Sequence, residues 1–207
     1  MRRVLIWRHG ETEQNAAGIY QGQLDTSLSA RGREQAATAA QLLAQRSPAR
    51  LVASDLTRAA TTAATLASAS GLTVEQDRRL REIDVGRWQG LTHPEVRERF
   101  PELQAELEQG QDVRRGETGE RVRDVARRMR AVFDEVVATQ EQDSTVVLAS
   151  HGLASRALVA DVLGMDFTRL TQALVGLHNC HWAELVEHDI GWRLDAWNTG
   201  APAATGR

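Results

Sequence analysis

The chain contains no lysine, and all 25 of its basic residues are arginine. A phosphate-binding P-loop, a protein-kinase site and a Schiff-base enzyme each depend on a lysine, so these three classes are excluded. Arginine is the better ligand where two parallel hydrogen bonds hold a phosphate, because its guanidinium is planar and carries five N–H donors. The missing lysine therefore removes several enzyme classes and leaves phosphate binding open.

Cysteine and long apolar runs are also scarce. The single cysteine, Cys180, cannot form a disulfide within the chain, which favours a reducing cytoplasm. No apolar run approaches the roughly 18 residues of a membrane span, and the apolar segment after Met1 is too short for a signal peptide. The formal net charge of -3 gives no general attraction to nucleic acid or to an anionic membrane. We therefore expect a cytoplasmic protein with no nucleic-acid or membrane partner.

Short apolar segments recur along the chain and alternate with segments of helical pattern. At 207 residues, 42% of them apolar, the chain suits one domain, 1–207, with a sizeable core. The strands predicted by this pattern are 4–7, 50–53, 73–75, 146–149, 182–186 and 192–197. The predicted helices are 56–68, 94–100, 122–137, 153–163 and one that is capped by Ser29 and runs to about residue 45. Strands that alternate with helices predict a three-layer α/β/α sandwich with a mainly parallel sheet.

Three segments fall outside this alternation. Residues 11–28 are polar and contain glycine, so they predict a loop. The segment 86–119 is rich in glycine and proline, and we interpret it as a small lid with one short helix and a polar stretch at 102–117. A plain surface insertion is the alternative reading of that segment. The last residues, 200–207, predict a frayed tail.

One small pattern occurs twice, and it is the most informative feature of the sequence. The apolar run 4–7 leads into Arg8-His9-Gly10, and the run 146–149 leads into Ser150-His151-Gly152. Each reads as a buried strand with a histidine at its carboxyl end. Because ligands of open α/β sheets bind outside the carboxyl ends of the strands, we expect the two histidines to face each other across one site.

The residues around these histidines favour phosphoryl chemistry. A neutral imidazole is a competent nucleophile toward phosphorus, which makes His9 the candidate nucleophile. Arg8 beside it and Arg58, in the first turn after the second strand, are candidates to bind phosphate oxygens, and Asn15 can donate to another. His151, if protonated, would help to neutralise the phosphate dianion.

A leaving alkoxide also needs a proton. Glu82 follows the third predicted strand and precedes the segment 86–119, so it is the best-placed acid. The same carboxylate would then act as the base on the water that hydrolyses a phosphohistidine. The sequence thus predicts His9, Glu82 and His151 as catalytic residues.

The segment Arg8-His9-Gly10-Glu11-Thr12-Glu13-Gln14-Asn15 resembles the signature of the histidine phosphatase superfamily, also called phosphoglycerate mutase-like. The resemblance continues in the family's order over about residues 3–165, in Gln21-Gly22, Asp25, Ser27-Leu28-Ser29, Gly32, Ser54-Asp55-Leu56-Thr57-Arg58-Ala59, Leu80-Arg81-Glu82, Gly86, Trp88, Gly90 and Ser150-His151-Gly152.

This resemblance implies a phosphohistidine at His9 and Glu82 as proton donor. It implies a phosphate pocket and further substrate-binding positions, made of Arg8, Asn15, Gln21, Gly22, Arg58, His151 and Gly152. It also implies that Asn179 contacts the site, that the protein is a homodimer and that its partner is a small phosphorylated metabolite. No metal or organic cofactor is implied.

Within the family, the short insertion and short tail favour a phosphatase over a phosphoglycerate mutase, which shields its phosphoenzyme from water with longer segments. Three segments (21–26, 88–93 and 192–198) resemble one subfamily, the actinobacterial glucosyl-3-phosphoglycerate phosphatases. The alternatives are a mutase, a broad-specificity sugar-phosphate phosphatase and an inactive module that senses a phosphometabolite.

Two histidine-containing segments need a separate reading. His178, Cys180 and His181 lie close together in sequence, but a structural zinc site needs four ligands, so we predict no metal there. His93, in the predicted lid, is a further candidate for contact with the substrate.

Overall fold

A six-stranded sheet with the order β3-β2-β4-β1-β5-β6 forms the centre of the computed structural model, which describes residues 1–201. Neighbours among the first four strands in this order run parallel, whereas β5 and β6 join as antiparallel strands at one edge. The mainly parallel sheet predicted from the sequence is confirmed. The strands are β1 (Arg3–Arg8), β2 (Arg50–Ala53), β3 (Val74–Gln76), β4 (Thr145–Ser150), β5 (Trp182–His188) and β6 (Gly191–Thr199).

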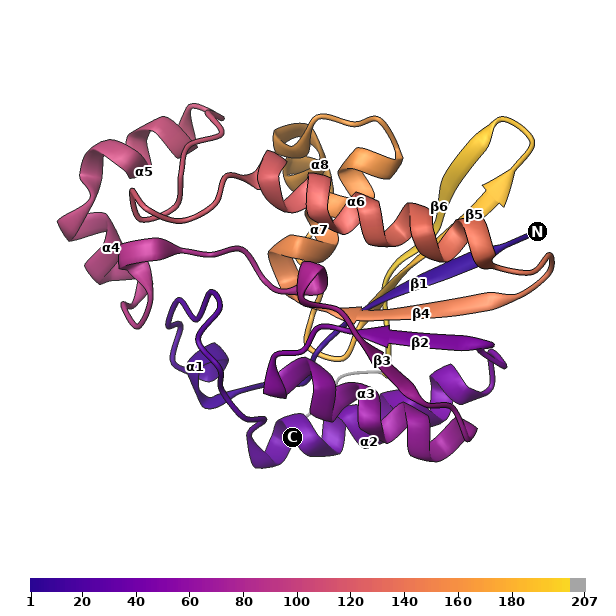
Figure 1. Cartoon of the computed structure of the whole chain (residues 1–207). Coiled ribbons are helices and arrows are strands. Elements are labelled where there is room, and N and C mark those ends of the chain that lie inside the picture. Colours follow the sequence, from indigo (N-terminus) through magenta and orange to yellow (C-terminus); the bar gives the residue numbers. More distant parts are fainter. Residues whose placement is uncertain (202–207) are drawn as a thin grey trace.

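Helices cover both faces of the sheet, which confirms the three-layer sandwich (Figure 1). Helices α2 (Ala30–Ala44) and α3 (Thr57–Ser70) lie on one face, and α6 (Val122–Thr139) and α7 (Gly152–Val162) lie on the other. Side chains alternate along β1: Leu5 and Trp7 belong to the core on the first face, and Val4 and Ile6 to the core on the second. A strand covered on both faces is apolar along its buried part, as residues 4–7 of β1 are.

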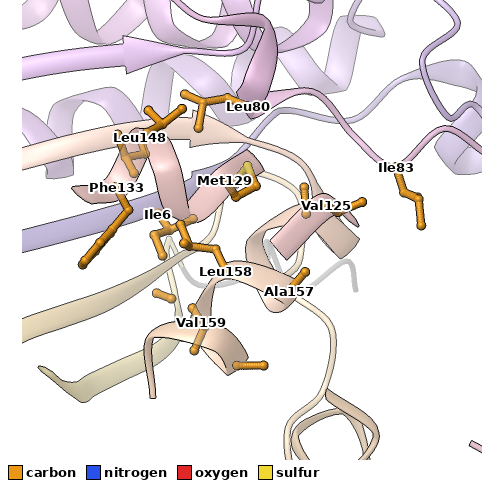
Figure 2. Close-up of a cluster of buried hydrophobic side chains, with 14 of the residues drawn as sticks. Ile6, Leu80, Ile83, Val125, Met129, Phe133, Leu148, Ala157, Leu158 and Val159 are labelled. Atoms are coloured by element: carbon orange, nitrogen blue, oxygen red, sulfur yellow. The ribbon is translucent and has the colours of Figure 1, made fainter. Parts of the chain in front are cut away.

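The core beneath α6 and α7 shows how the helical periodicity is used (Figure 2). Ile6 of β1 and Leu148 of β4 belong to the same buried cluster as Met129 and Phe133 of α6 and Leu158 of α7. Met129 and Phe133 stand four residues apart, so they share one face of the helix. The long amphipathic helix predicted at 122–137 is confirmed, and it extends to Thr139.

The ends of α2 and α3 follow from local chemistry. The Ser29 hydroxyl accepts a hydrogen bond of 3.0 Å from the Gly32 N–H and caps α2, as the sequence predicts. Helix α3 ends at Gly71, whose φ of +74° lies in the left-handed region that glycine adopts without a steric penalty.

Three helices were not predicted from the sequence: α1 (Glu13–Ala16), α5 (Pro101–Glu108) and α8 (Phe167–Ala173). Helix α1 is a single turn inside the expected loop, closed by a capping box between Thr12 and Asn15. Helix α5 replaces the first part of the expected polar stretch, residues 102–108. Its two leucines, Leu103 and Leu107, are only partly buried against the core, so its apolar face is narrow and the pattern weak.

The segment 86–119 holds the 3₁₀ turn η2 (Gly86–Trp88), α4 (His93–Arg99) and α5, and it follows the 3₁₀ turn η1 (Arg78–Leu80). Helices α1, α4 and α5 lie on the left in Figure 1, beyond the sheet and away from the N-terminus. This is the side on which the parallel strands end. The predicted tail lies outside the described residues from 202 onward, and no helix within 1–201 is long and apolar enough to span a membrane.

Candidate active site

The two predicted histidines lie side by side at the carboxyl ends of neighbouring strands. Strands β1 and β4 pair in parallel with Arg8 opposite Ser150, so the next residue of each strand, His9 and His151, emerges at the same height. Their ring centroids are 5.0 Å apart and the ring planes meet at 61°. Both side chains are buried, which places them at the floor of a site rather than on its rim.

The hydrogen bonds of His9 define its tautomer. Its Nδ1 lies 2.7 Å from the carbonyl oxygen of Gly10, and because a carbonyl only accepts, Nδ1 carries the proton. Nε2 therefore holds a lone pair, to which the Nε–H of Arg58 donates at 3.3 Å. Burial, and then the charges of Arg58 and Arg8, hold the pKa of His9 well below 6.5. At neutral pH this imidazole is uncharged and carries the lone pair that a nucleophile needs.

His151 is bonded through the opposite ring nitrogen. Its Nε2 lies 2.9 Å from the Ser54 hydroxyl, whereas its buried Nδ1 has no partner within the described residues. Burial and the charge of Arg58 lower the pKa of His151 well below 6.5. The sequence analysis makes charge neutralisation by His151 conditional on its protonation. The lowered pKa favours the neutral imidazole at neutral pH, because a fully buried ring beside guanidinium groups does not readily gain a proton.

Arg58 is a buried cation at the first turn of α3, only 1% exposed. Its guanidinium donates to the carbonyl oxygens of Leu24 at 2.7 Å and Gly22 at 2.8 Å. Burial lowers its pKa to about 10, so it stays charged at neutral pH. Gly22 has a φ of +52°, and a Cβ there would stand 2.6 Å from a Val85 methyl group. Glycine at this position thus allows the loop to approach closely and present its carbonyl to Arg58.

Arg8 has fewer protein partners than Arg58. Its side chain donates to the carbonyl oxygen of Leu177, while its buried Nε has no partner within the described residues. Burial is the main cause that lowers the pKa of its guanidinium. Gly152 lies beside this guanidinium, and a Cβ there would stand 3.4 Å from the Nε, in ordinary van der Waals contact.

Glu82 is held at the amino end of α7. Its carboxyl oxygens accept hydrogen bonds from the backbone N–H groups of Leu153 at 3.1 Å and Ala154 at 2.9 Å, and from its neighbour Ile83 at 2.9 Å. The N–H groups of Leu153 and Ala154, in the first turn of α7, have no partner inside their own helix, so a carboxylate is a natural acceptor for them. The helix that begins at Gly152, directly after His151, therefore also orients the predicted acid.

Arg128 of α6 holds the segment that leads into Glu82. Its guanidinium donates to the carbonyl oxygens of Arg79 at 2.7 Å, Arg81 at 2.6 Å and Glu82 at 2.9 Å, and it pairs with Glu120 at 2.8 Å. In the sequence, this arginine falls on the polar face of the helix predicted at 122–137, a pattern that predicts exposure to solvent. That interpretation is wrong, because the turn preceding Glu82 packs over this end of the helix, and only 17% of the side chain is exposed.

Two amide side chains complete the wall beside His9. Asn15 accepts from the Asn179 Nδ2 at 3.3 Å, and that same Nδ2 donates to the His9 carbonyl oxygen at 3.0 Å. Gln21 accepts from the hydroxyls of Thr12 at 3.1 Å and Thr26 at 2.6 Å. Since both oxygens are occupied, the amide NH₂ groups of Asn15 and Gln21 are the atoms free to meet an anion. Asn179 thus contacts the site through Asn15 and His9.

A cavity of about 340 Å³ lies above these residues. Of the predicted site residues, all but His151 and Gly152 line it, and His93 lines it too. Sequence reasoning missed two of its four arginines, Arg115 and Arg156. Arg156 had a usable signal, because it stands four residues after Gly152 and so shares one face of α7 with the residue beside Arg8. Arg115 comes from the segment 86–119 and had no such signal.

Within residues 1–201, no three His, Cys, Asp or Glu side chains gather as a metal site.

The comparison of the sequence with known protein families agrees with this arrangement of site residues. The model of the histidine phosphatase superfamily (branch 1) matches residues 4–200. The chain belongs to this superfamily. Proteins that are similar to this chain over nearly its whole length include phosphatases. The chain is a hydrolase of phosphomonoesters.

Three similar proteins bear on the choice between a phosphatase and a mutase. A glucosyl-3-phosphoglycerate phosphatase of Mycolicibacterium vanbaalenii is 42% identical, over 99% of this chain and 97% of the relative. The solved structure of a mycobacterial glucosyl-3-phosphoglycerate phosphatase in complex with VO3 has a TM-score of 0.89 and 39% identity, covering 97% of this chain and 100% of that chain. A probable phosphoglycerate mutase GpmB of Erwinia tasmaniensis is 31% identical, over 95% of this chain and 90% of the relative. The mutase resemblance is the more distant.

Proposed function

We propose that this protein removes the phosphate of glucosyl-3-phosphoglycerate through a covalent phosphohistidine at His9. The observation that carries the mechanism is the lone pair on His9 Nε2, held in a cavity with Arg58 at 3.3 Å and flanked by Arg8. The substrate is supported by the 42% and 39% identity to phosphatases named for it, each over nearly the whole chain.

The first step forms a bond between His9 Nε2 and phosphorus and breaks the phosphorus–oxygen bond of the ester. Arg8 and Arg58 neutralise the charge on the equatorial oxygens, and the NH₂ groups of Asn15 and Gln21 donate to them. His151, as a neutral imidazole, offers its Nδ1–H when the Ser54 hydroxyl donates to Nε2.

The leaving alkoxide takes its proton from Glu82, the one carboxyl group that lines the cavity among the described residues. In the second step Glu82, now a carboxylate, accepts a proton from a water molecule that attacks the phosphorus. The phosphorus–nitrogen bond breaks, inorganic phosphate leaves, and Nε2 of His9 regains its lone pair. The proton given to the alkoxide is thus regained from the water, and the cycle returns Glu82 to its starting state.

The segment 86–119 acts as the lid in this proposal. Trp88, His93, Leu107 and Arg115 of that segment all line the cavity. The Tyr20 ring faces Trp88 and His93, with centroids 5.5 Å and 4.4 Å away, so an aromatic wall stands above the phosphate site. Such a wall suits the leaving group of a sugar phosphate, since ligand pockets are lined mainly by apolar and aromatic side chains.

The assay is phosphate release in the presence of EDTA, with glucosyl-3-phosphoglycerate, 3-phosphoglycerate and an aryl phosphate as substrates. We expect kcat/KM to be highest for the first. Equal and slow release from all three indicates a broad-specificity phosphatase. Conversion of 3-phosphoglycerate into 2-phosphoglycerate without free phosphate indicates a mutase, and binding with no turnover of any ester indicates a sensor.

Two further properties belong to the proposal. We expect one domain acting as a homodimer, which the family resemblance implies and light scattering tests. We also expect a cytoplasmic location, supported by the free thiol of Cys180, whose burial raises its pKa to about 12. Fractionation of cells tests the location.

A further inference from the structure

Among the residues that the structure describes, Arg156 is the one arginine of the cavity with no hydrogen bond or ion pair to a protein group. It lies on α7, half-buried, and lines the cavity beside His9 and Glu82. No hydrogen bond or ion pair to its guanidinium exists within residues 1–201, and its Nε is buried without a partner. By contrast, Arg58 donates to two carbonyl oxygens, while Arg8 and Arg115 each donate to one.

The nearest carboxylate does not account for this side chain. Glu82 attracts Arg156 electrostatically, but its oxygens are already bound to the N–H groups of Leu153, Ala154 and Ile83. The charge of Arg8 is also close enough to repel Arg156. A half-buried cation beside another cation, with no anion bound to it, is costly unless a ligand supplies the counter-charge.

The phosphate of a monoester does not need this third cation. A phosphate dianion is matched in charge by Arg8 and Arg58, which flank His9. Arg156 stands farther along α7, one turn after Gly152, and a Cβ on Gly176 would stand 4.0 Å from it. The guanidinium therefore has the charge and the planar donor fork to take a second anionic group on the part of the substrate that leaves.

We propose that Arg156 binds a carboxylate on the alcohol portion of the substrate and so selects carboxylated phosphomonoesters. The inference rests on the proposed phosphatase function and narrows its substrate class. Substrates that carry only the phosphate leave Arg156 without a partner, and they lose the free energy of a charge-assisted pair in the bound state and the transition state alike.

The test compares two esters that share one skeleton. In 3-phosphoglycerate a carboxylate stands where glycerol 3-phosphate has a hydroxymethyl group. The measured quantity is the ratio of kcat/KM for these two substrates, in the wild type and in Arg156→Met. We expect the wild type to prefer 3-phosphoglycerate and Arg156→Met to reduce the ratio about 10- to 100-fold, the range of a hydrogen bond to a charged group. Arg156→Lys keeps the charge without the planar fork and is expected to retain part of the preference.

Arg127→Met is the matched control, because Arg127 is an exposed arginine on α6. An unchanged ratio in Arg156→Met overturns the proposal, whether both substrates slow equally, as expected of a phosphate ligand, or neither changes. A wild type without preference for 3-phosphoglycerate overturns it as well. Loss of the proposed function gives a different result: the wild type then releases no phosphate from either ester, or His9→Ala keeps its activity.

Discussion

The two strand–histidine–glycine units of this protein have similar sequences and opposite hydrogen bonding. In the first, His9 binds the Gly10 carbonyl through Nδ1 and keeps a lone pair on Nε2. In the second, His151 binds the Ser54 hydroxyl through Nε2 and leaves Nδ1 without a partner within the described residues. The comparison teaches that the partner of a ring nitrogen, and not the motif around the histidine, decides which ring can attack phosphorus.

The two partners come from different places in the chain. Gly10 is the next residue after His9, so the tautomer of the first unit is set locally. Ser54 follows β2 and reaches His151 because β2 and β4 are neighbours in the sheet. A hydroxyl both donates and accepts, so it permits either tautomer of His151, whereas the carbonyl permits only one of His9. The first unit suits a nucleophile, and the second suits a donor to phosphate oxygens.

Removing the nucleophile has the largest expected effect. His9→Ala loses about 10⁴-fold or more in kcat, because it removes the Nε2 lone pair that begins the reaction. Steady-state phosphate release measures it. His188→Ala is the control, since His188 ends β5 at the opposite end of the sheet and is expected to leave kcat unchanged. If His9→Ala keeps most of its activity, His9 is not the nucleophile and the contrast between the two units is wrong.

Removing the second histidine has a smaller effect. His151→Ala loses one neutral donor to the transition state, and we expect kcat to fall about 10²- to 10³-fold. The variant still forms phospho-His9, which rapid quenching in alkali followed by mass spectrometry detects. If His151→Ala forms no phosphoenzyme while His9→Ala does, the two roles are reversed.

The Ser54 hydroxyl sharpens the comparison, because it bonds to the second histidine and not to the first, and its other partner is the Leu56 N–H at 3.3 Å. Ser54→Ala removes the partner of His151 Nε2, and we expect kcat to fall about 2- to 10-fold, the size of a net neutral hydrogen bond. Ser68→Ala is the control, since its exposed hydroxyl bonds only to its own helix, at Ala64. A double-mutant cycle with His151→Ala should show no additional loss from Ser54→Ala. Full additivity would contradict the pairing.

The smallest expected effect is on how the free energy of unfolding depends on pH. The folded protein lowers the pKa of both His9 and His151 well below 6.5, so the unfolded chain binds more protons in acid. Their contribution to stability is fully present above 6.5 and is lost as the pH falls from there through the lowered values. Urea unfolding at about pH 7.5 and about pH 5.5 measures it. His9→Gln should lose less free energy of unfolding between the two pH values than the wild type, and an equal loss contradicts the burial argument.

The sequence predicted the floor of the site well, for a physical reason. The buried strands around His9 and His151 are continuous apolar runs, and parallel strands bring their carboxyl ends together whatever the loops do. The residues of the cavity wall were harder to predict from the sequence. Whether Arg128 faces solvent or the site depends on which segment packs over α6, and the sequence of that helix does not contain this information, whereas the position of Arg156 four residues after Gly152 was a signal that could have been used. The protonation of His151 depends on burial, which is a property of the assembled fold.

The most direct test of the central claim is the position of the phosphoryl group in the trapped intermediate. Protein mixed with substrate and quenched in alkali can be digested, and the phosphorylated nitrogen assigned by mass spectrometry and ³¹P–¹⁵N NMR. The account predicts phosphate on Nε2 of His9. Phosphate on His151, on Nδ1 of His9, or on no side chain during turnover would contradict it.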